Sequence, residues 1–176
     1  FFALVQKEAL KQGGVFFLDA GEGHIFENEN MEYSDLRGWL IPIEKAEEFN
    51  KEYQVRLGDT ICFCDNSYEL LKSLKGRVKQ YAVTNGTKIA QDRKLLKSGL
   101  IDVFDDIFIS EEVGYEKPDI RFFEHVWAKI GAYKPNEVMI VGDSLTSDMQ
   151  GGNNTGIVCC WYNPNKISND KNLKIS

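Results

Sequence analysis

The stretch VMIVGDSLTSDMQGG, residues Val138 to Gly152, decides the fold. Its apolar beginning stops at Gly142, which predicts a strand buried on both faces of a parallel sheet, because such a strand has no polar side. Asp143 follows the strand directly, and Asp148 lies about one helical turn further on. Two carboxylates at the carboxyl end of a parallel strand are typical of a Mg²⁺ site, since this ion prefers oxygen ligands. Asp and Ser are also good N-caps, so this stretch alone fits a capped helix equally well.

Length and charge limit the classes of protein. A chain of 176 residues with a net charge of −6 suits one compact domain with its own core, or such a core with a small insertion. The acidic balance argues against a nucleic-acid partner, which clustered Lys and Arg would have to bind. No apolar run reaches the roughly 18 residues that a membrane span needs, and the N-terminus lacks a signal-peptide pattern. We therefore expect a soluble cytoplasmic protein, monomeric or homodimeric, with no membrane partner.

The cysteines do not form a metal-binding pattern. They contain no CxxC pair and lie far from the two histidines, at positions Cys62, Cys64, Cys159 and Cys160. A zinc site is therefore not predicted. We expect all four cysteines to be small buried apolar residues in a reducing compartment.

The first third of the chain is predicted to be mainly helical. Phe1–Gln12 has the spacing of one apolar helix face and is followed by two glycines,. Residues 15–18 fit a short strand, and residues 31–40 fit a helix. A clearer helix is predicted to begin at Pro42 and to end at Gly58; its apolar face comprises Ala46, Phe49, Tyr53 and Leu57.

From about Asp59 onward, predicted strands and helices alternate. The strands cover residues 78–83, 107–109 and 157–161, together with the one that begins at Val138. The helices begin at Asn66 or Ser67, at Thr87 and at Asp119; their inward faces are Leu70, Leu71 and Leu74 in the first, and Ile120, Phe123, Trp127 and Ile130 in the last. This alternation is typical of an α/β fold, a parallel sheet with helices on both faces.

Polar residues at the predicted strand ends suit a phosphoryl group, whose transition-state charge is met by fixed donors and a metal. The Thr84 hydroxyl and the backbone amides of Asn85 and Gly86 are expected to bind phosphate oxygens. Lys117, in the loop before a helix, would neutralise the phosphate and the carboxylates near Asp143. Each signal alone is also typical of an ordinary turn or loop. Their order on successive strand ends favours a phosphate site.

These motifs resemble those of the haloacid dehalogenase (HAD) superfamily of phosphohydrolases. YAVTNG at Tyr81–Gly86 is similar to its second motif, and GYEKPD at Gly114–Asp119 to its third. GDS at 142–144 with Asp148 matches the fourth, GDSxxxxD, in full. Over roughly residues 42–165 the chain resembles the YjjG- and YfnB-like branch, bacterial pyrimidine nucleoside 5′-monophosphate phosphatases. The resemblance implies a Rossmann-like α/β core with a partial helical cap, Mg²⁺, and a phospho-aspartyl intermediate that water hydrolyses.

The resemblance also assigns roles to the site residues. Thr84 and Lys117 would hold the phosphate during catalysis, and Asp143 would bind Mg²⁺. Asp148 would steady Lys117 or take part in binding the metal. The implied substrate is a small phosphorylated metabolite, with a nucleotide as the first choice.

The family's first motif, DxDxT, which supplies the nucleophile, is not found. Asp19 ends an apolar run, but Gly21 and Gly23 stand where the second Asp and the Thr belong. The better alignment makes residues 1–58 a cap remnant and residues 59–176 a core without its first strand. The nucleophile then precedes residue 1, and this chain alone has little or no activity. Asp19 as an irregular nucleophile is the other interpretation.

Two other functions fit the same residues. A 2-haloacid dehalogenase shares the fold but needs no metal, so it has little use for Asp143 beside Asp148. A non-catalytic domain that binds phosphate or a partner would show Mg²⁺ and phosphate binding without turnover. A receiver domain of two-component signalling also carries Asp, Thr and Lys at strand ends, but in an order that this chain does not have.

Overall fold

The structure is a computed structural model that describes residues 43–64, 66–131 and 133–175. The helices predicted over residues 1–12 and 31–40, the strand predicted over residues 15–18, and Asp19 all lie outside the described residues. The helices are α2 (Ile43–Asp59), α3 (Ser67–Leu74), α4 (Lys88–Ser98), α5 (Ser110–Val113), α6 (Ile120–Ile130) and α7 (Gln150–Thr155). The strands are β1 (Tyr81–Thr84), β2 (Asp106–Ile109), β3 (Met139–Gly142) and β4 (Val158–Trp161). Short turns of helix also occur: η2 (Leu100–Asp102), η3 (Pro135–Glu137) and the π-helical turn η4 (Leu145–Met149).

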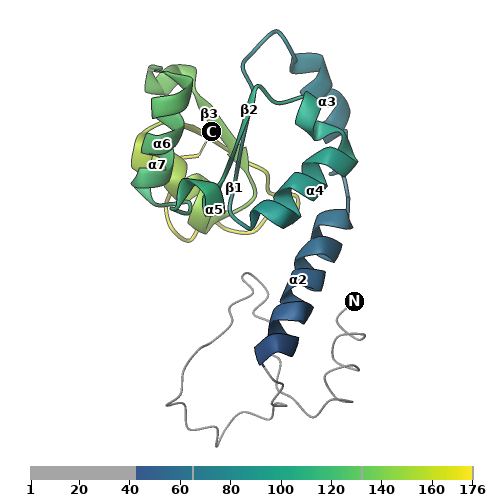
Figure 1. Cartoon of the computed structure of the whole chain (residues 1–176). Coiled ribbons are helices and arrows are strands. Elements are labelled where there is room, and N and C mark those ends of the chain that lie inside the picture. The colour runs from purple at the N-terminus through teal and green to yellow at the C-terminus, as the bar shows by residue number, and fades with distance from the viewer. Residues whose placement is uncertain (1–42, 65, 132, 176) are drawn as a thin grey trace, which may run out of the picture.

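The described strands form two parallel pairs. β1 pairs with β2, with Thr84 opposite Ile109, and β3 pairs with β4, with Gly142 opposite Trp161. Helices α6 and α7 lie on one side of β1 and β2, and α3 and α4 lie on the other (Figure 1). Parallel strands joined through helices confirm the α/β class. Within the described chain no ladder joins β1 to β3, so the predicted sheet is present as two halves.

Strand β3 is buried on one face only. Ile140 is 6% exposed, whereas Met139 and Val141 on the opposite face are 57% and 66% exposed. The prediction that both faces of this strand are buried is therefore wrong for the described residues. Apolar side chains favour burial, but no described segment covers the face that carries Met139 and Val141.

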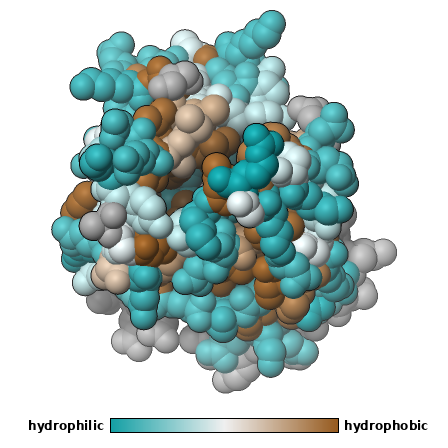
Figure 2. Space-filling view, turned by 90° about the horizontal axis from the view of Figure 1, so that it is seen from above, coloured by the Kyte–Doolittle hydropathy of each residue, from teal (hydrophilic) through white to brown (hydrophobic). Residues whose placement is uncertain are grey.

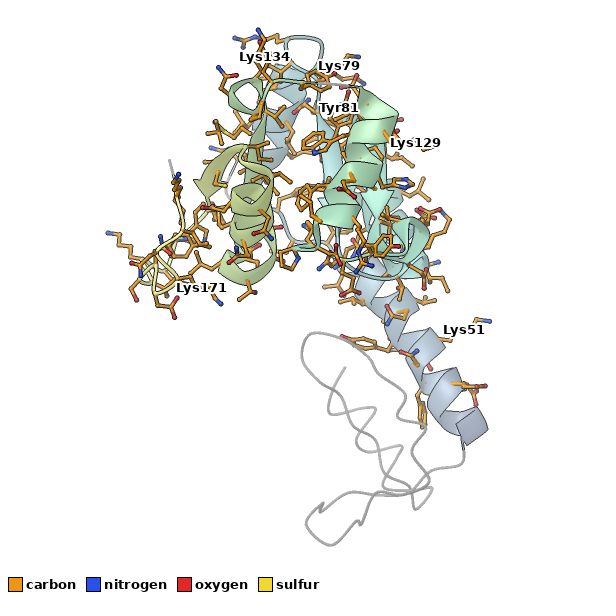
Figure 3. All side chains as sticks on the ribbon, turned by 90° about the vertical axis from the view of Figure 1, so that its left-hand side faces the viewer. Lys51, Lys79, Tyr81, Lys129, Lys134 and Lys171 are labelled. Carbon is orange, nitrogen blue, oxygen red and sulfur yellow. The ribbon has the colours of Figure 1, made fainter. Side chains whose placement is uncertain are left out.

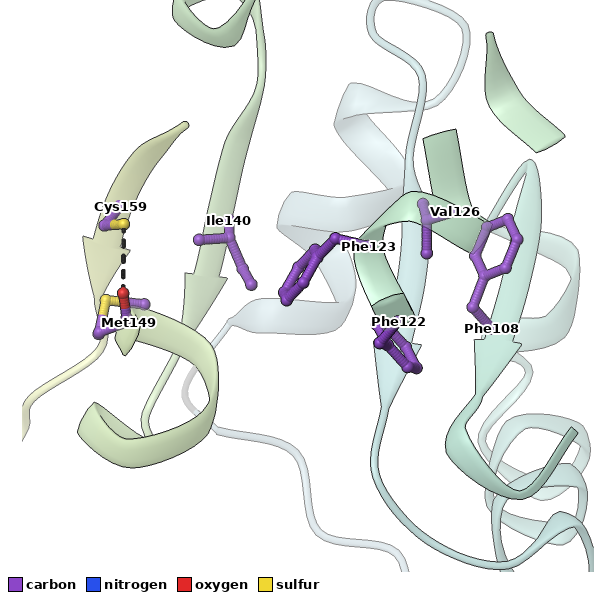
Figure 4. Close-up of a cluster of buried hydrophobic side chains, with 7 residues drawn as sticks. All are labelled: Phe108, Phe122, Phe123, Val126, Ile140, Met149 and Cys159. Atoms are coloured by element: carbon purple, nitrogen blue, oxygen red, sulfur yellow. Dashed lines mark hydrogen bonds between the residues drawn. The ribbon is translucent and has the colours of Figure 1, made fainter. Parts of the chain in front are cut away.

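One hydrophobic cluster joins the two halves of the sheet. Figure 4 shows Phe122, Phe123 and Val126 of α6 between Phe108 of β2 on one side and Ile140 of β3 on the other. Met149 and Cys159 complete the cluster beyond Ile140. Because α6 contacts side chains from both strand pairs, burial of its apolar face stabilises their arrangement even without a ladder between them.

The buried face of α6 is displaced from the predicted one. Phe123 is buried as predicted, and Trp127 and Ile130 pack partly buried against the cluster. Phe122 and Val126, which lie outside the predicted face, are buried, whereas Ile120 in the first turn is exposed. The placement of Ile120 was therefore wrong. The apolar stripe is centred on Phe122 and Phe123, and Ile120 falls at its margin.

The segment before β1 is less buried than the sequence predicted. Cys62 and Cys64 are exposed, so the expectation that all four cysteines are buried holds for Cys159 but is wrong for these two. Leu70 of α3 is also exposed, contrary to its predicted inward position. Helix α3 has no buried residue, because it lies at the edge of the fold (Figure 1). Seen from above, apolar side chains reach the surface of the molecule among polar ones (Figure 2).

Helix α2 packs on α4 at one end and extends away from the strands (Figure 1). It continues through Gly58 to Asp59, so the prediction that Gly58 ends it is wrong. A Cβ at Gly58 would lie 2.8 Å from the carbonyl oxygen of Ala90; this glycine therefore permits the close approach of the two helices. Asp59 accepts two hydrogen bonds from Arg93, at 2.6 and 2.9 Å. No described helix is long and apolar enough to cross a membrane.

Candidate functional site

Lys117 lies at the carboxyl end of β1 and joins it to the segment after β3. Its ammonium donates to the carbonyl oxygen of Val83 at 2.8 Å and pairs with Asp148 Oδ1 at 2.5 Å. The side chains of Lys117 and Asp148 are 8% and 11% exposed. Two of the predicted site residues, 31 positions apart, therefore form a buried ion pair. Such a pair has a fixed geometry when the remaining groups of both partners are hydrogen-bonded, and loss of one partner leaves a buried charge without compensation.

Both carboxylate oxygens of Asp148 have partners. Oδ1 accepts from Lys117, and Oδ2 accepts the backbone N–H of Ser144 at 3.2 Å. The π-helical turn η4 carries Asp148 back beneath the end of β3, where a Cβ on Gly142 would lie 2.3 Å from Oδ2. Only glycine leaves room for this carboxylate. In this arrangement Asp148 is a partner of Lys117 and of the Ser144 backbone, and its part in binding a metal stays a prediction.

Asp143 is the more open of the two predicted metal ligands. It is exposed, and none of the described residues donates a hydrogen bond to its carboxylate. Its carbonyl oxygen accepts from Trp161 Nε1 at 2.9 Å, which fixes the backbone at the end of β3. The described part of the chain contains no group of three or more His, Cys, Asp or Glu side chains that would enclose a metal. Mg²⁺ usually keeps several waters and takes one or two carboxylates with substrate phosphate, so Asp143 fits as a single ligand.

The loop after β1 is tied to the segment that carries Lys117. The side-chain amide of Asn85 donates to the carbonyl oxygen of Lys117, and its oxygen accepts the Lys117 backbone N–H, both at 2.9 Å. The Gly86 N–H, predicted to bind phosphate, donates to Ser110 Oγ at 3.0 Å. The Thr84 hydroxyl makes one long bond, 3.3 Å, to the carbonyl oxygen of Asn85. The Thr84 hydroxyl is thus less engaged than the Gly86 N–H.

The N-terminus of α4 is satisfied by protein groups. Thr87 caps the helix by accepting the Ala90 N–H, and the Lys88 N–H donates to Glu111 at 2.7 Å. A carboxylate therefore meets the positive end of the helix dipole, where the sequence suggested phosphate. The Lys88 ammonium pairs with Glu112 and Asp92, which raises the pKa of Lys88.

Sequence reasoning missed Ser110 and the carbonyl group of Val83. Ser110 is buried, and its hydroxyl contacts both the N–H and the carbonyl oxygen of Gly86. The one available signal was its position directly after a predicted strand. The carbonyl of Val83 had no signal, because every residue carries one.

The described fold is an α/β fold of parallel strand pairs and helices, with polar residues gathered where the strands end,. Residues 8–156 match the haloacid dehalogenase-like hydrolase family, and the chain belongs to this family.

Three relatives illustrate the match. The pyrimidine 5′-nucleotidase PynA of Streptococcus pneumoniae is 40% identical over 118 residues, which are 66% of this chain and 48% of PynA. The glyceraldehyde 3-phosphate phosphatase of Methanothermobacter thermautotrophicus is 37% identical over 99 residues, 56% of this chain and 43% of that protein. The crystal structure of the HAD hydrolase YfnB of Bacillus subtilis, bound to magnesium, aligns with a TM-score of 0.70 and 32% identity, over 74% of this chain and 57% of YfnB. The chain spans about half the length of the curated relatives it matches.

Proposed function

We propose that this protein is a Mg²⁺-dependent phosphatase that hydrolyses small phosphate monoesters, with nucleoside 5′-monophosphates as the first candidates, through a phospho-aspartyl intermediate. The observation that carries the proposal is the buried ion pair of Lys117 and Asp148 at the carboxyl end of β1. Its ammonium stands at the strand end that carries Thr84. The fixed Lys117 cation, the weakly bonded Thr84 hydroxyl and the exposed Asp143 carboxylate together meet the needs of phosphoryl transfer, which depends on positioning and charge,.

Each residue has one role in this proposal. The Thr84 hydroxyl donates to a phosphate oxygen, since its present bond is long. The Lys117 ammonium neutralises the phosphate charge, and Asp148 holds that ammonium in place. Asp143 would hold Mg²⁺, which supplies positive charge to the phosphoryl group when bound. Magnesium in the YfnB structure supports the choice of metal.

The nucleophile belongs, in this proposal, to a strand between β1 and β3. Within the described residues, β1 and β3 each pair with a strand on one side and have no hydrogen-bonded strand on the other. The carboxyl ends of parallel strands lie together on the same side of a sheet. A carboxylate at the end of an inserted parallel strand would therefore face Lys117. Where a segment upstream of residue 1 supplies this strand, residues 59–176 are the core that receives it and residues 1–58 are the cap remnant. The two sources of the strand are Asp19 with the residues before it, and a segment upstream of residue 1.

The substrate class is tested with the full-length protein. We expect Mg²⁺-dependent release of phosphate from pyrimidine nucleoside monophosphates, by analogy with PynA. Glyceraldehyde 3-phosphate is assayed beside them because a second relative carries that activity. A 2-haloacid, scored by halide release, tests the dehalogenase alternative, which leaves Asp143 without a purpose. Phosphate release that is equal with and without a chelator would contradict the proposal.

A non-catalytic phosphate-binding domain is the second candidate. One observation favours it. Asp148 is already paired with Lys117, so this carboxylate could attack phosphorus only by losing that partner. Phosphate and Mg²⁺ binding to the full-length protein, with no turnover of any ester in the panel, would support this candidate over the phosphatase.

A further inference from the structure

We propose that Asn85 is a positioning residue that fixes Lys117 relative to Thr84. The functional part of this inference rests on the proposed phosphatase activity; the structural part does not. Asn85 and Lys117 are 32 positions apart, yet the side-chain amide of Asn85 bonds both backbone polar groups of Lys117, each at 2.9 Å. The Asn85 side chain therefore satisfies both backbone polar groups of Lys117, as the backbone of a paired strand would do.

Residues 83–85 bond both the side-chain ammonium and the backbone of Lys117. The Lys117 ammonium donates to the carbonyl oxygen of Val83, and the Lys117 backbone bonds to Asn85. Thr84 lies between these two anchor points. The distance between the Thr84 hydroxyl and the Lys117 ammonium is thus set by three hydrogen bonds to residues 83 and 85. In the proposed function these are the two groups that share one phosphate, so their spacing governs how well it is bound.

The chemistry of the contact requires an amide at position 85. Asn offers a donor and an acceptor on one side chain, whereas Asp offers acceptors alone and Ala offers neither. The Lys117 N–H and carbonyl group lie on a buried residue, where a polar group without a partner is costly. Asn85→Ala is therefore expected to release the backbone of Lys117 and to increase the motion of its ammonium.

The chain contains a matched control. Asn153 donates to the carbonyl oxygen of Lys174 at 3.0 Å and accepts the Lys174 N–H at 2.8 Å. This pair of bonds has the same pattern as the one at Asn85, but it holds a segment near the C-terminal end of the described chain. Asn153→Ala removes the same groups, together with the bonds of this amide to the Met149 carbonyl oxygen and to Cys159 Sγ, without touching Thr84 or Lys117.

The structural test measures the reactivity of Lys117 by reductive methylation and peptide mapping. Lys129, exposed on α6 and pointing away from the strands (Figure 3), is the internal reference. In Asn85→Ala, labelling of Lys117 relative to Lys129 is expected to rise about tenfold, because the variant loses two hydrogen bonds to a buried residue. Asn153→Ala is expected to leave this ratio unchanged. An unchanged ratio in Asn85→Ala, or an equal rise in both variants, would overturn the inference.

The functional test uses the full-length enzyme and separates kcat from KM. Asn85→Ala is expected to lower kcat by about tenfold or more, and Asn153→Ala to stay within about twofold, although both lower the Tm. Equal losses of kcat in the two variants would show that Asn85 acts through stability alone. If the wild-type protein releases no phosphate, the proposed function fails, and the labelling ratio still decides whether Asn85 positions Lys117.

Discussion

Replacing Lys117 by methionine is expected to destabilise the fold strongly, because the Asp148 carboxylate would remain buried without its cation. The two side chains are about nine-tenths buried and 2.5 Å apart. In the variant, Asp148 would retain the Ser144 N–H as its described donor. Removing one partner of a buried ion pair costs about 3–5 kcal/mol, which corresponds to roughly 6 to 20 °C in Tm for a chain of this size.

Urea unfolding followed by tryptophan fluorescence at pH 7 measures this loss. Asp148→Asn is combined with Lys117→Met to complete a double-mutant cycle. The neutral amide no longer needs the ammonium, so the double variant is expected to be more stable than Lys117→Met alone. Lys129→Met, at an exposed position of α6, is the control and should change stability by no more than about 0.5 kcal/mol. A loss below about 1 kcal/mol in Lys117→Met, or strictly additive losses in the cycle, would refute the reasoning.

Three other predictions concern packing, pH and reactivity. Gly152→Ala is expected to lose about 1–3 kcal/mol, since its Cβ would lie 2.4 Å from Cys159 Sγ; Cys159→Ala should restore part of the loss in urea unfolding, and a stabilised Gly152→Ala would contradict the contact. Arg93 holds the pKa of the Asp59 carboxyl well below its usual range, so Asp59 contributes stability above about pH 4, the pKa of an unfolded Asp, and less as pH falls below it. The Tm difference between wild type and Asp59→Asn should therefore be largest near pH 7 and shrink below about pH 4; a constant difference would count against the ion pair. Burial raises the pKa of the Cys159 thiol, so a thiol reagent at about pH 8 should modify exposed Cys62 first; mass spectrometry of the peptides checks the order, and equal rates would argue against burial.

The alternation of elements could be read from the sequence because each element carries its own period. The strand ending at Thr84 and the helix closed by Gly99 both follow from local patterns of apolar residues and glycine,. The exposure of Val141 could not be read in this way, since an apolar side chain does not indicate which segment covers it. Ile120 shows the related difficulty: the apolar spacing gave the helix but not the centre of its buried face.

The order of polar residues along the chain was sufficient to bring Lys117 and Asp148 together as candidates. It could not show that both oxygens of Asp148 accept hydrogen bonds, or that the Asn85 side chain bonds to the backbone of Lys117. These contacts join residues that are distant in sequence, and a single sequence carries no signal for such a pair. The Gly86 amide was assigned to phosphate on local grounds, and its bond to Ser110 depends on the neighbouring strand β2.

The most direct test of the account is the Mg²⁺ dependence of phosphate release by the full-length protein and its Asp143→Asn variant. Asp106→Asn, an exposed acid at the start of β2, is the matched control for the loss of one carboxylate. Wild type and Asp106→Asn are expected to release phosphate from nucleoside monophosphates with Mg²⁺ and to stop in excess chelator, whereas Asp143→Asn is expected to lose most of its activity at every Mg²⁺ concentration. Equal Mg²⁺ titration curves for Asp143→Asn and Asp106→Asn would contradict the metal role of Asp143 and the site built around it.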